Sequence, residues 1–380
     1  MTTIYLDHAA TTPVHPEVTA HYAQLLGTLF GNPSSIHSYG REARKWLDTA
    51  RKTMAQSINA SPSEIIFTSG GTEADNIAIF GTVAAMKKKG NHIITTNIEH
   101  HAVLNPCKQL ELDGYDVTFL EVDENGQIHV DQIKTALKDE TILVSIMFGN
   151  NEVGTIQPIQ SIGDILKDHQ AIFHTDAVQA YGLVPLDVKA LGVDLLSVSS
   201  HKLNGPKGAG FLYQRKGIET APFIHGGQQE RKRRAGTENV PAIVAFSDAV
   251  KFAQQSMKEN STKYRMFGSK LMTIFNEHNL TYIENGAGVE KLPHILNISF
   301  PGTDIESLLV NLDMAGICVS SGSACSAGSL DPSHVLTAMF GKGAPQLRNS
   351  VRFSFGLGLD HERIEEAAHK TAEIVKRLVK

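Results

Sequence analysis

Residues 172–202 read IFHTDAVQAYGLVPLDVKALGVDLLSVSSHK, and this stretch decides the fold class. Two strand-like runs lie within it, at 172–176 and 195–198. Short, continuously apolar runs are typical of strands buried on both faces, as in a parallel sheet. The first run ends at Asp176, and the second leads into Lys202. Because parallel strands end at one edge, where open α/β folds bind ligands, we expect these two side chains to lie together.

The same pattern extends on both sides of this stretch, from about residue 60 to residue 215. Further strand-like runs lie at 65–68, 92–95, 117–120 and 142–148. Segments of helical length separate them, at 72–89, 101–113, 131–138 and 158–169. Such an alternation predicts an α/β fold with a mostly parallel sheet that helices cover on both faces.

The ends of the chain have a different texture. Helices are predicted from Pro16 to about Phe30 and over 39–58, where apolar residues recur at helical spacing. After about residue 255, strand-like and helical segments predict a smaller α+β domain; they are 295–300, a helix from 304, 351–355 and 360–379. We therefore expect a large domain of residues 16–255 and a small domain of residues 1–15 and 256–380, with the site in a cleft between them.

The composition excludes several classes of protein. Of 380 residues, 41% are hydrophobic and 20% charged, which fits neither a disordered chain nor a collagen-like repeat. Lys and Arg number 35 against 40 for Asp and Glu, a formal charge of −5, so direct nucleic-acid binding is not expected. No apolar run is long enough to cross a bilayer and no targeting segment is visible, so we expect a cytoplasmic protein without a membrane role.

Lys202 and Asp176 together have the chemistry of a pyridoxal phosphate site. A lysine amine can hold the cofactor's aldehyde as a Schiff base, and a carboxylate keeps the pyridine nitrogen protonated so that the ring acts as an electron sink. Each residue also has a simpler interpretation. Lys202 could be a solvated loop residue, and Asp176 could cap the segment that follows it.

A phosphate site is suggested by Thr68-Ser69-Gly70-Gly71-Thr72-Glu73, where a strand passes through two glycines into a helix. Helix N-termini present free N–H groups and the positive end of the dipole. The alternative is an ordinary capped turn in which Thr72 is the cap. A charge in the middle of a strand, Arg352, is expected either to bind a substrate carboxylate in the cleft or to form a structural salt bridge.

Two further strand ends carry polar residues. His100 and His101 follow the run 92–95, and one imidazole could stack on a cofactor and move protons, or either could be a surface cap. Asn150-Asn151-Glu152-Val153-Gly154 follows the run 142–148 and is either a turn or a source of amides for the site.

The three cysteines differ in their surroundings. Their number is odd and their spacing matches neither a disulfide framework nor a zinc site, so no metal is expected. Cys107 and Cys318 have apolar contexts and are interpreted as structural. Cys325 lies in the Gly- and Ser-rich stretch 320–329, which predicts an exposed loop and a nucleophilic thiolate.

With these motifs in this order, the chain resembles the class V pyridoxal phosphate enzymes, and among them the cysteine desulfurases of the NifS/IscS group. The resemblance covers essentially the whole chain. It rests on 5–12 (YLDHAATT), 31–35 (GNPSS), 68–73 (TSGGTE), 150–154 (NNEVG), 174–177 (HTDA), 200–202 (SHK), 321–325 (SGSAC) and 351–354 (VRFS). It implies the fold type I of pyridoxal phosphate transferases, whose large domain has a seven-stranded, mostly parallel sheet.

The resemblance also implies a role for each matching residue. Lys202 carries the cofactor, Asp176 pairs with its pyridinium nitrogen, Gln179 bonds its phenolic oxygen, and His100 stacks on its ring and moves protons. The phosphate is held by Gly71, Thr72, Ser199 and His201. Asn151 and Arg352 orient the substrate, and Asn151 also belongs to the cofactor site. Thr237 matches a threonine that completes the phosphate site of the second subunit, which implies a homodimer.

The implied reaction is the conversion of L-cysteine to L-alanine, with Cys325 receiving the sulfur as a persulfide. The expected acceptor is a tRNA 2-thiouridylase or an iron–sulfur scaffold, and Cys325 could transiently ligate a shared cluster. Alternatives are a class V aminotransferase or a selenocysteine lyase. A sulfur-relay docking protein is a third alternative, suggested by the basic cluster Glu230-Arg231-Lys232-Arg233-Arg234, which could instead be a solvated face.

Overall fold

The computed structural model describes residues 3–321 and 332–379 and contains a seven-stranded sheet of order β2-β8-β7-β6-β5-β3-β4. Its strands are β2 (Ile65–Thr68), β3 (His92–Thr96), β4 (Asp116–Leu120), β5 (Thr141–Ser145), β6 (Ile172–Asp176), β7 (Leu195–Ser199) and β8 (Gly210–Gln214). Strands β3 to β7 are parallel, and β8 pairs antiparallel with both β2 and β7. The predicted mostly parallel seven-stranded sheet is confirmed. The sequence pattern had not singled out β8.

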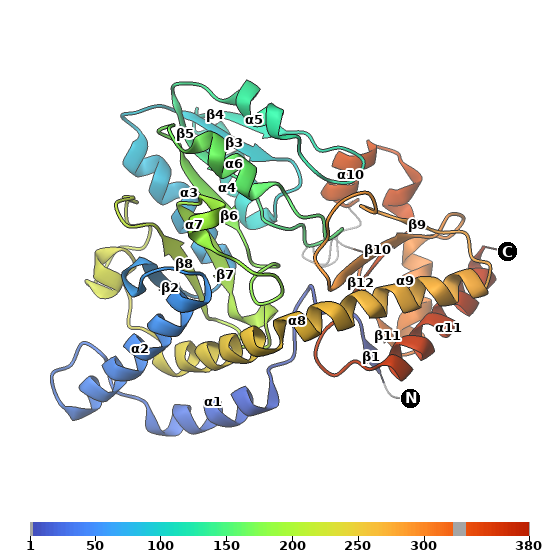
Figure 1. Cartoon of the computed structure of the whole chain (residues 1–380), viewed down its shortest axis with the longest axis horizontal. Coiled ribbons are helices and arrows are strands. Elements are labelled where there is room, and N and C mark those ends of the chain that lie inside the picture. Colours follow the sequence, from blue (N-terminus) through green and yellow to red (C-terminus); the bar gives the residue numbers. More distant parts are fainter. Residues whose placement is uncertain (1–2, 322–331, 380) are drawn as a thin grey trace.

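Helices cover both faces of this sheet (Figure 1). On one face lie α3 (Gly71–Met86) and α4 (His101–Leu112). The core on the other face includes α1 (Pro16–Thr28), α2 (Ser38–Ser57), α5 (Val130–Ala136), α6 (Ile159–Leu166), α7 (Val188–Leu191) and the start of α8 (Val240–Glu277). Neighbouring residues alternate between the cores, since Ile65 and Phe67 belong to one and Ile66 to the other.

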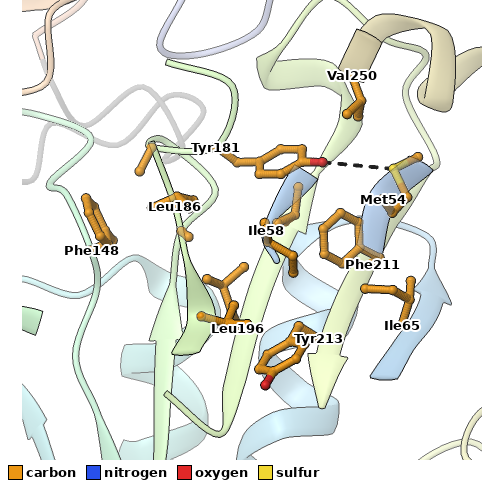
Figure 2. Packing of buried hydrophobic residues seen from close by; sticks show 14 of the residues in the cluster. Met54, Ile58, Ile65, Phe148, Tyr181, Leu186, Leu196, Phe211, Tyr213 and Val250 are labelled. Atoms are coloured by element: carbon orange, nitrogen blue, oxygen red, sulfur yellow. Dashed lines mark hydrogen bonds between the residues drawn. The ribbon is translucent and has the colours of Figure 1, made fainter. Parts of the chain in front are cut away.

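The core beneath β6 fixes the segment that carries Asp176 and Gln179. Tyr181 is 1% exposed, and its ring meets that of Phe211 edge-on, with centroids 5.4 Å apart (Figure 2). The Tyr181 hydroxyl lies 2.5 Å from Ser57 Oγ on α2. A buried ring that also satisfies its polar end is costly to move, so this contact holds the chain that follows β6.

A second core lies beyond the large sheet. It packs α9 (Ile305–Met314), α11 (His361–Leu378) and the end of α8 against two small sheets. The sheets are β12-β10-β9 and β1-β11, with β1 (Ile4–Tyr5), β9 (Ile283–Glu284), β10 (Ile295–Ser299), β11 (Ile317–Cys318) and β12 (Ser350–Ser354). Helix α10 (His334–Phe340) contributes to a smaller cluster beside it.

Helix α8 connects the two cores (Figure 1). It has 38 residues, so it is about 57 Å long at 1.5 Å per residue. Its buried residues from Val240 to Val250 belong to the first core, and those from Tyr264 to Phe275 belong to the second. The predicted domain boundary at residue 255 falls inside this helix, and the division of the chain into 16–255 and 1–15 with 256–380 stays a prediction.

Several predicted elements are shorter than expected, among them a helix and a strand of the large sheet. Helix α3 ends at Met86, before the three lysines that the prediction over 72–89 included. Strand β5 ends at Ser145, although residues 146–148 are also buried. A run of apolar residues indicates burial and does not show which of those residues form hydrogen bonds to a neighbouring strand. The predicted strand 142–148 was therefore too long at its end. In the part of the chain that the structure describes, no helix combines the length and apolarity needed to cross a bilayer.

Candidate active site

A cavity of about 190 Å³ lies at the carboxyl ends of β6 and β7, below the N-terminus of α3. Residues from the first and last parts of the chain close it. The lining residues are Ala9, Ala10, Gly71, Thr72, Asp75, His100, Met147, Gly149, Asn151, Asp176, Val178, Gln179, Ser199, His201, Lys202 and Arg352. Every predicted cofactor or substrate residue in the described part of the chain is in this set, except Thr237.

Lys202 is held at the floor of the cavity by the N-terminal segment. A 3₁₀ turn, Ser200–Lys202, follows β7 directly and turns the side chain back over the strand end. Its Nζ donates to the backbone carbonyl of Ala9 at 2.5 Å and to that of Ala10 at 2.9 Å. The lysine is therefore a half-buried group of the site, and its interpretation as a solvated loop residue is wrong.

Asp176 is a buried carboxyl whose neighbours are also acidic. It is 5% exposed, and its Oδ1 accepts a hydrogen bond from the Val178 N–H at 2.9 Å. Burial raises the pKa of Asp176, although that bond and the nearby Lys202 both oppose the rise. Asp75, on the first turns of α3, is 1% exposed, and burial and the charge of Asp176 raise its pKa well above the ordinary value. This pair of acids favours a ligand that brings a positive charge or a proton.

Asp75 was not singled out from the sequence. Ligand atoms of Asp75, His100 and Asp176 lie within 4.8 Å of one another. Asp75 Oδ1 makes no hydrogen bond among the described residues, and His174 Nε2 is 3.5 Å away. No local pattern distinguishes an Asp inside an apolar helix from a solvated one, so only the packing of α3 against the sheet reveals it.

The N-terminus of α3 opens onto the cavity. The N-cap is Gly70, with φ of 152° and no side-chain cap, so Thr72 lies inside the first turn and the predicted Thr72 cap is wrong. A Cβ on Gly71 would lie 2.7 Å from Val178 Cγ2, so only glycine fits there without a shift. The first N–H groups of a helix have no partner within it. Together with the side chains of Thr72, Ser199 and His201, they form a cradle for an anion.

His100 is both a helix cap and a wall of the cavity. Its Nδ1 accepts a hydrogen bond from the Ala102 N–H at 3.1 Å, at the start of α4. Burial, followed by the charge of Lys202, lowers the pKa of His100 to about 4. The imidazole is therefore neutral near pH 7 and carries its proton on Nε2, since Nδ1 is an acceptor.

Arg352 combines the two interpretations that the sequence left open. It is 2% exposed; its Nη1 donates to the Asn151 carbonyl and its Nη2 to Asp7 Oδ1, both at 2.8 Å. Its Nε makes no hydrogen bond among the described residues. A guanidinium has five N–H donors, and these two bonds use two of them, so the buried Arg352 can still bind an anion in the cavity that it lines. The pairing with Asp7, across nearly the whole chain, was missed.

The basic cluster at 230–234 is only partly a solvated face, since Arg231 and Lys232 are exposed while Glu230 is buried. The Glu230 carboxylate accepts hydrogen bonds from both terminal nitrogens of Arg51, at 2.8 and 2.6 Å, and from the Phe67 N–H at 3.1 Å. Arg234 binds Glu73, on the first turn of α3. These pairs fasten the segment to α2 and α3, so Glu230 and Arg234 are not the free charges that the solvated interpretation expected.

Thr237 and the three cysteines are not among the lining residues of this cavity that the structure describes. Thr237 is exposed and outside the cavity of its own chain. Cys325 lies outside the residues that the structure describes. Cys107 is fully buried, and burial raises the pKa of its thiol to about 12, which fits its structural interpretation; Cys318 is half-buried in β11.

Comparison with known proteins places this site in a family. The family model described as Aminotransferase class-V matches residues 4–366. The chain belongs to the class-V aminotransferases. Its members use pyridoxal phosphate.

The relatives with high coverage are cysteine desulfurases by name. A protein of Bacillus subtilis (strain 168) named "Putative cysteine desulfurase IscS 1" is 57% identical over 378 residues, covering 100% of both chains. "Cysteine desulfurase IscS" of Methanosarcina thermophila is 47% identical over 377 residues, covering 99% of this chain and 92% of that one. Among solved structures, a "NIFS-LIKE PROTEIN" matches with a TM-score of 0.92 and 36% identity, covering 99% and 100%.

The residues of the cavity fit this cofactor. Lys202 supplies the amine, and the buried acid pair calls for the positive charge that a protonated pyridine ring brings. The glycine at 71 leaves room for an anion to approach the α3 backbone, where a Cβ would meet Val178. Aldehyde, ring nitrogen and phosphate thus each have a matching group in the cavity.

Proposed function

We propose that this protein is a cysteine desulfurase. It converts L-cysteine and the thiol of Cys325 into L-alanine and a persulfide on Cys325. One observation carries the proposal: Lys202, Asp176, the N-terminus of α3 and Arg352 line a single cavity, in a chain whose relatives are named cysteine desulfurases. The atoms balance, since the sulfur that leaves the substrate is the outer sulfur of the persulfide.

Pyridoxal phosphate, when bound, supplies an aldehyde for the amino group and a ring that accepts electrons. Lys202 is the amine that holds it. Asp176 keeps a positive charge next to the ring nitrogen, because its buried carboxylate needs a compensating charge. His100 is neutral and lies above the site, so its Nε2 can exchange a proton with the substrate carbon.

Arg352 binds the substrate carboxylate through guanidinium N–H groups that its bonds to Asn151 and Asp7 leave unused. Those two bonds orient the guanidinium before the substrate arrives. Asn151, which lines the same cavity, lies beside the substrate.

Both described ends of the segment that contains Cys325 are attached next to these residues. Ser320 pairs with Arg352 through two backbone hydrogen bonds, of 2.7 and 3.3 Å. Ser333, on the other side, donates from Oγ to Glu152 at 2.5 Å, next to Asn151. This attachment supports Cys325 as the residue that receives the sulfur.

The test uses the purified protein loaded with pyridoxal phosphate. With L-cysteine and a dithiol, it should release equal amounts of alanine and sulfide. Lys202→Ala should lose both the visible absorbance and the products. Cys325→Ser should keep the absorbance and lose nearly all of the sulfide. Full sulfide release by Cys325→Ser would contradict the nucleophile, and formation of a keto acid in place of alanine would indicate an aminotransferase. Activity with L-selenocysteine but not with L-cysteine would indicate a selenocysteine lyase.

The assembly is part of the same proposal. We place Thr237, which is exposed and outside its own cavity, in the phosphate site of the second subunit of a homodimer. Mixed dimers of Lys202→Ala and Thr237→Ala subunits test this directly. Each such dimer contains one site with both residues intact, so mixing should restore activity that neither variant has alone. An additive mixture would contradict a shared site.

The sulfur acceptor and the cell compartment are proposed from the sequence. A tRNA 2-thiouridylase or an iron–sulfur scaffold in the cytoplasm fits the resemblance. Capture of acceptors by the protein after incubation with L-cysteine, read by mass spectrometry, distinguishes these two. A Cys325→Ser sample is the matched control, because it retains every surface except the thiol. Recovery of neither class by the wild-type protein would contradict both assignments.

A further inference from the structure

We propose that His294 is a positioning residue that holds the side-chain amide of Gln179 in the orientation needed to donate to the cofactor. Gln179 lines the cavity and is 7% exposed. His294, 115 residues away in the chain and 4% exposed, lies behind it. The inference rests on the proposed function, in which Gln179 bonds the phenolic oxygen of the cofactor.

The surroundings of Gln179 leave one orientation for its amide. Its Nε2 donates to the Ala9 carbonyl at 2.9 Å, and its Oε1 lies 3.1 Å from His294 Nε2. If the Gln179 amide were reversed, its Oε1 would face the Ala9 carbonyl oxygen, and neither oxygen can donate a hydrogen bond. The Ala9 carbonyl therefore takes one of the two amide hydrogens, and the other remains available to a group in the cavity.

The same contacts fix the tautomer of His294. Its Nδ1 makes no hydrogen bond among the described residues, and Gln179 Oε1 can only accept. A proton on Nδ1 would leave a buried donor without an acceptor, so the proton is on Nε2 and points at Gln179. Burial lowers the pKa of His294 to about 3, and the nearby His8, Arg352 and Lys202 contribute to the same shift. The ring is therefore neutral near pH 7.

His294 is itself held rigidly. It immediately precedes β10, and its backbone carbonyl accepts the Phe355 N–H at 2.9 Å, just after β12. The second core therefore fixes His294, whereas Gln179 belongs to the segment that follows β6 in the large sheet. The His294–Gln179 bond joins the two parts of the molecule at the cofactor site, and it requires the acceptor side of the amide to face β10.

The test is a pH titration of the visible absorbance of the holoenzyme, without substrate. A donor to the phenolic oxygen stabilises its anion, so losing that donor raises the pH at which the absorbance changes. His294→Ala should raise this apparent pKa by about 1, as expected for one hydrogen bond to a charged group. Gln179→Ala should raise it by the same amount, and the double variant no further, because both act through one bond.

Two conservative variants separate positioning from packing. His294→Gln carries an amide N–H where His294 has Nε2, so it should restore the titration of the native enzyme. In His294→Asn the amide N–H lies at the position of Nδ1 and is too short to reach Gln179, so this variant should behave like His294→Ala. This pair keeps the test usable if His294→Ala does not fold, since both variants retain a polar side chain.

The outcomes distinguish this inference from the proposed function. If Gln179→Ala shifts the titration and neither His294→Ala nor His294→Asn does, the inference is overturned and the proposed function stands. Additive shifts in the double variant also overturn it, because they show that His294 acts independently of Gln179. If Gln179→Ala leaves the titration unchanged, the assigned cofactor contact fails and the inference fails with it.

Discussion

Arg352 shows how one side chain can stabilise the fold and bind a substrate. Its ion pair with Asp7 joins the N-terminal segment to β12, and the side chains are 2% and 19% exposed. Breaking a buried pair leaves an uncompensated charge, which costs more than the pair contributes. The arginine could not be interpreted from sequence alone, because the sequence does not show which carboxylate faces it.

Asp7→Asn tests this pairing. It should cost about 2 kcal/mol of stability, seen as a lower Tm, because the Arg352 charge stays buried with a neutral partner. Asp131→Asn is the matched control, since Asp131 pairs with Lys134 on the exposed surface of α5, where water screens the pair, and its loss should leave the Tm nearly unchanged. Equal changes in Tm for the two variants would contradict the structural role of Asp7.

At the scale of elements, the N-terminus of α3 is the part of the site most constrained by packing. Gly71→Ala places a methyl group 2.7 Å from Val178 Cγ2, so the helix start must shift away from β6. We expect the affinity for pyridoxal phosphate to fall at least about tenfold, equivalent to about 1.4 kcal/mol. The measurement is a titration of the apoenzyme with the cofactor, followed by visible absorbance.

Two variants check that the effect of Gly71→Ala is local. Val178→Ala in the same chain removes the clashing methyl group and should recover part of the affinity. Gly27→Ala, in α1, has no atom within 4 Å of the added carbon and should leave the affinity unchanged. A loss of affinity in Gly27→Ala as large as that in Gly71→Ala would contradict the explanation by the cradle.

The segment around Glu230 is the second element with a specific constraint. The backbone has positive φ values of 44°, 58° and 69° at Glu230, Arg231 and Lys232, and residues other than glycine rarely adopt such values. The pair between Glu230 and Arg51 holds the segment in this conformation, with side chains 1% and 12% exposed. Since Thr237 follows a few residues later, the same pair supports the proposed contact with the second subunit.

Glu230→Gln should destabilise the protein by about 3 kcal/mol and speed proteolysis within 226–237, because Arg51 loses a buried counter-charge. Limited proteolysis read by mass spectrometry measures the local effect. Asp48→Asn is the control, as it removes an exposed pair with Arg44 from the surface pocket that Arg51 and Glu230 also line. Unchanged cleavage in Glu230→Gln would show that the backbone conformation does not depend on this pair.

At the scale of the whole molecule, buried histidines determine the response to acid. Burial lowers the pKa of each to about 3 or 4; they are His8, His100, His174, His201 and His294. Between pH 6.5 and 4 the unfolded chain binds protons on these rings that the folded chain does not, so stability falls as the pH falls. Glu99 has the opposite sign, because burial raises its pKa to about 8 and stability is lost as the pH rises from about 4.5 to 8.

We therefore expect the Tm of the apoenzyme to be highest near neutral pH and to fall steeply from pH 6.5 to pH 4. Scanning calorimetry in buffers of constant ionic strength measures this. Burial also lowers the pKa of His92, His101 and His334, which makes eight such rings among the described residues. They outnumber the five buried acids whose pKa is raised, which are Asp75, Glu99, Glu152, Asp176 and Asp194, so the net slope below pH 6.5 is set by the rings. A Tm that is flat over this interval would contradict the neutral, buried state of the histidines.

The sequence by itself determined six of the seven strands of the large sheet, most helices, and the Lys202 and Asp176 pair with its cofactor chemistry, because these depend on local patterns. Apolar runs of strand length predict buried strands, and the ends of parallel strands share one edge. The order of residues along the chain was therefore enough to place Lys202 and Asp176 together.

Only the tertiary structure decided which groups act on those residues. Arg352 donates to Asp7, 345 positions away in the sequence, and His294 contacts Gln179, 115 positions away. Asp75, on α3, lies close to Asp176 at the end of β6. Such contacts depend on how the two cores pack around α8, and their strength comes from the exclusion of water. A short window of sequence shows neither the packing nor the loss of water, because both arise only in the folded interior.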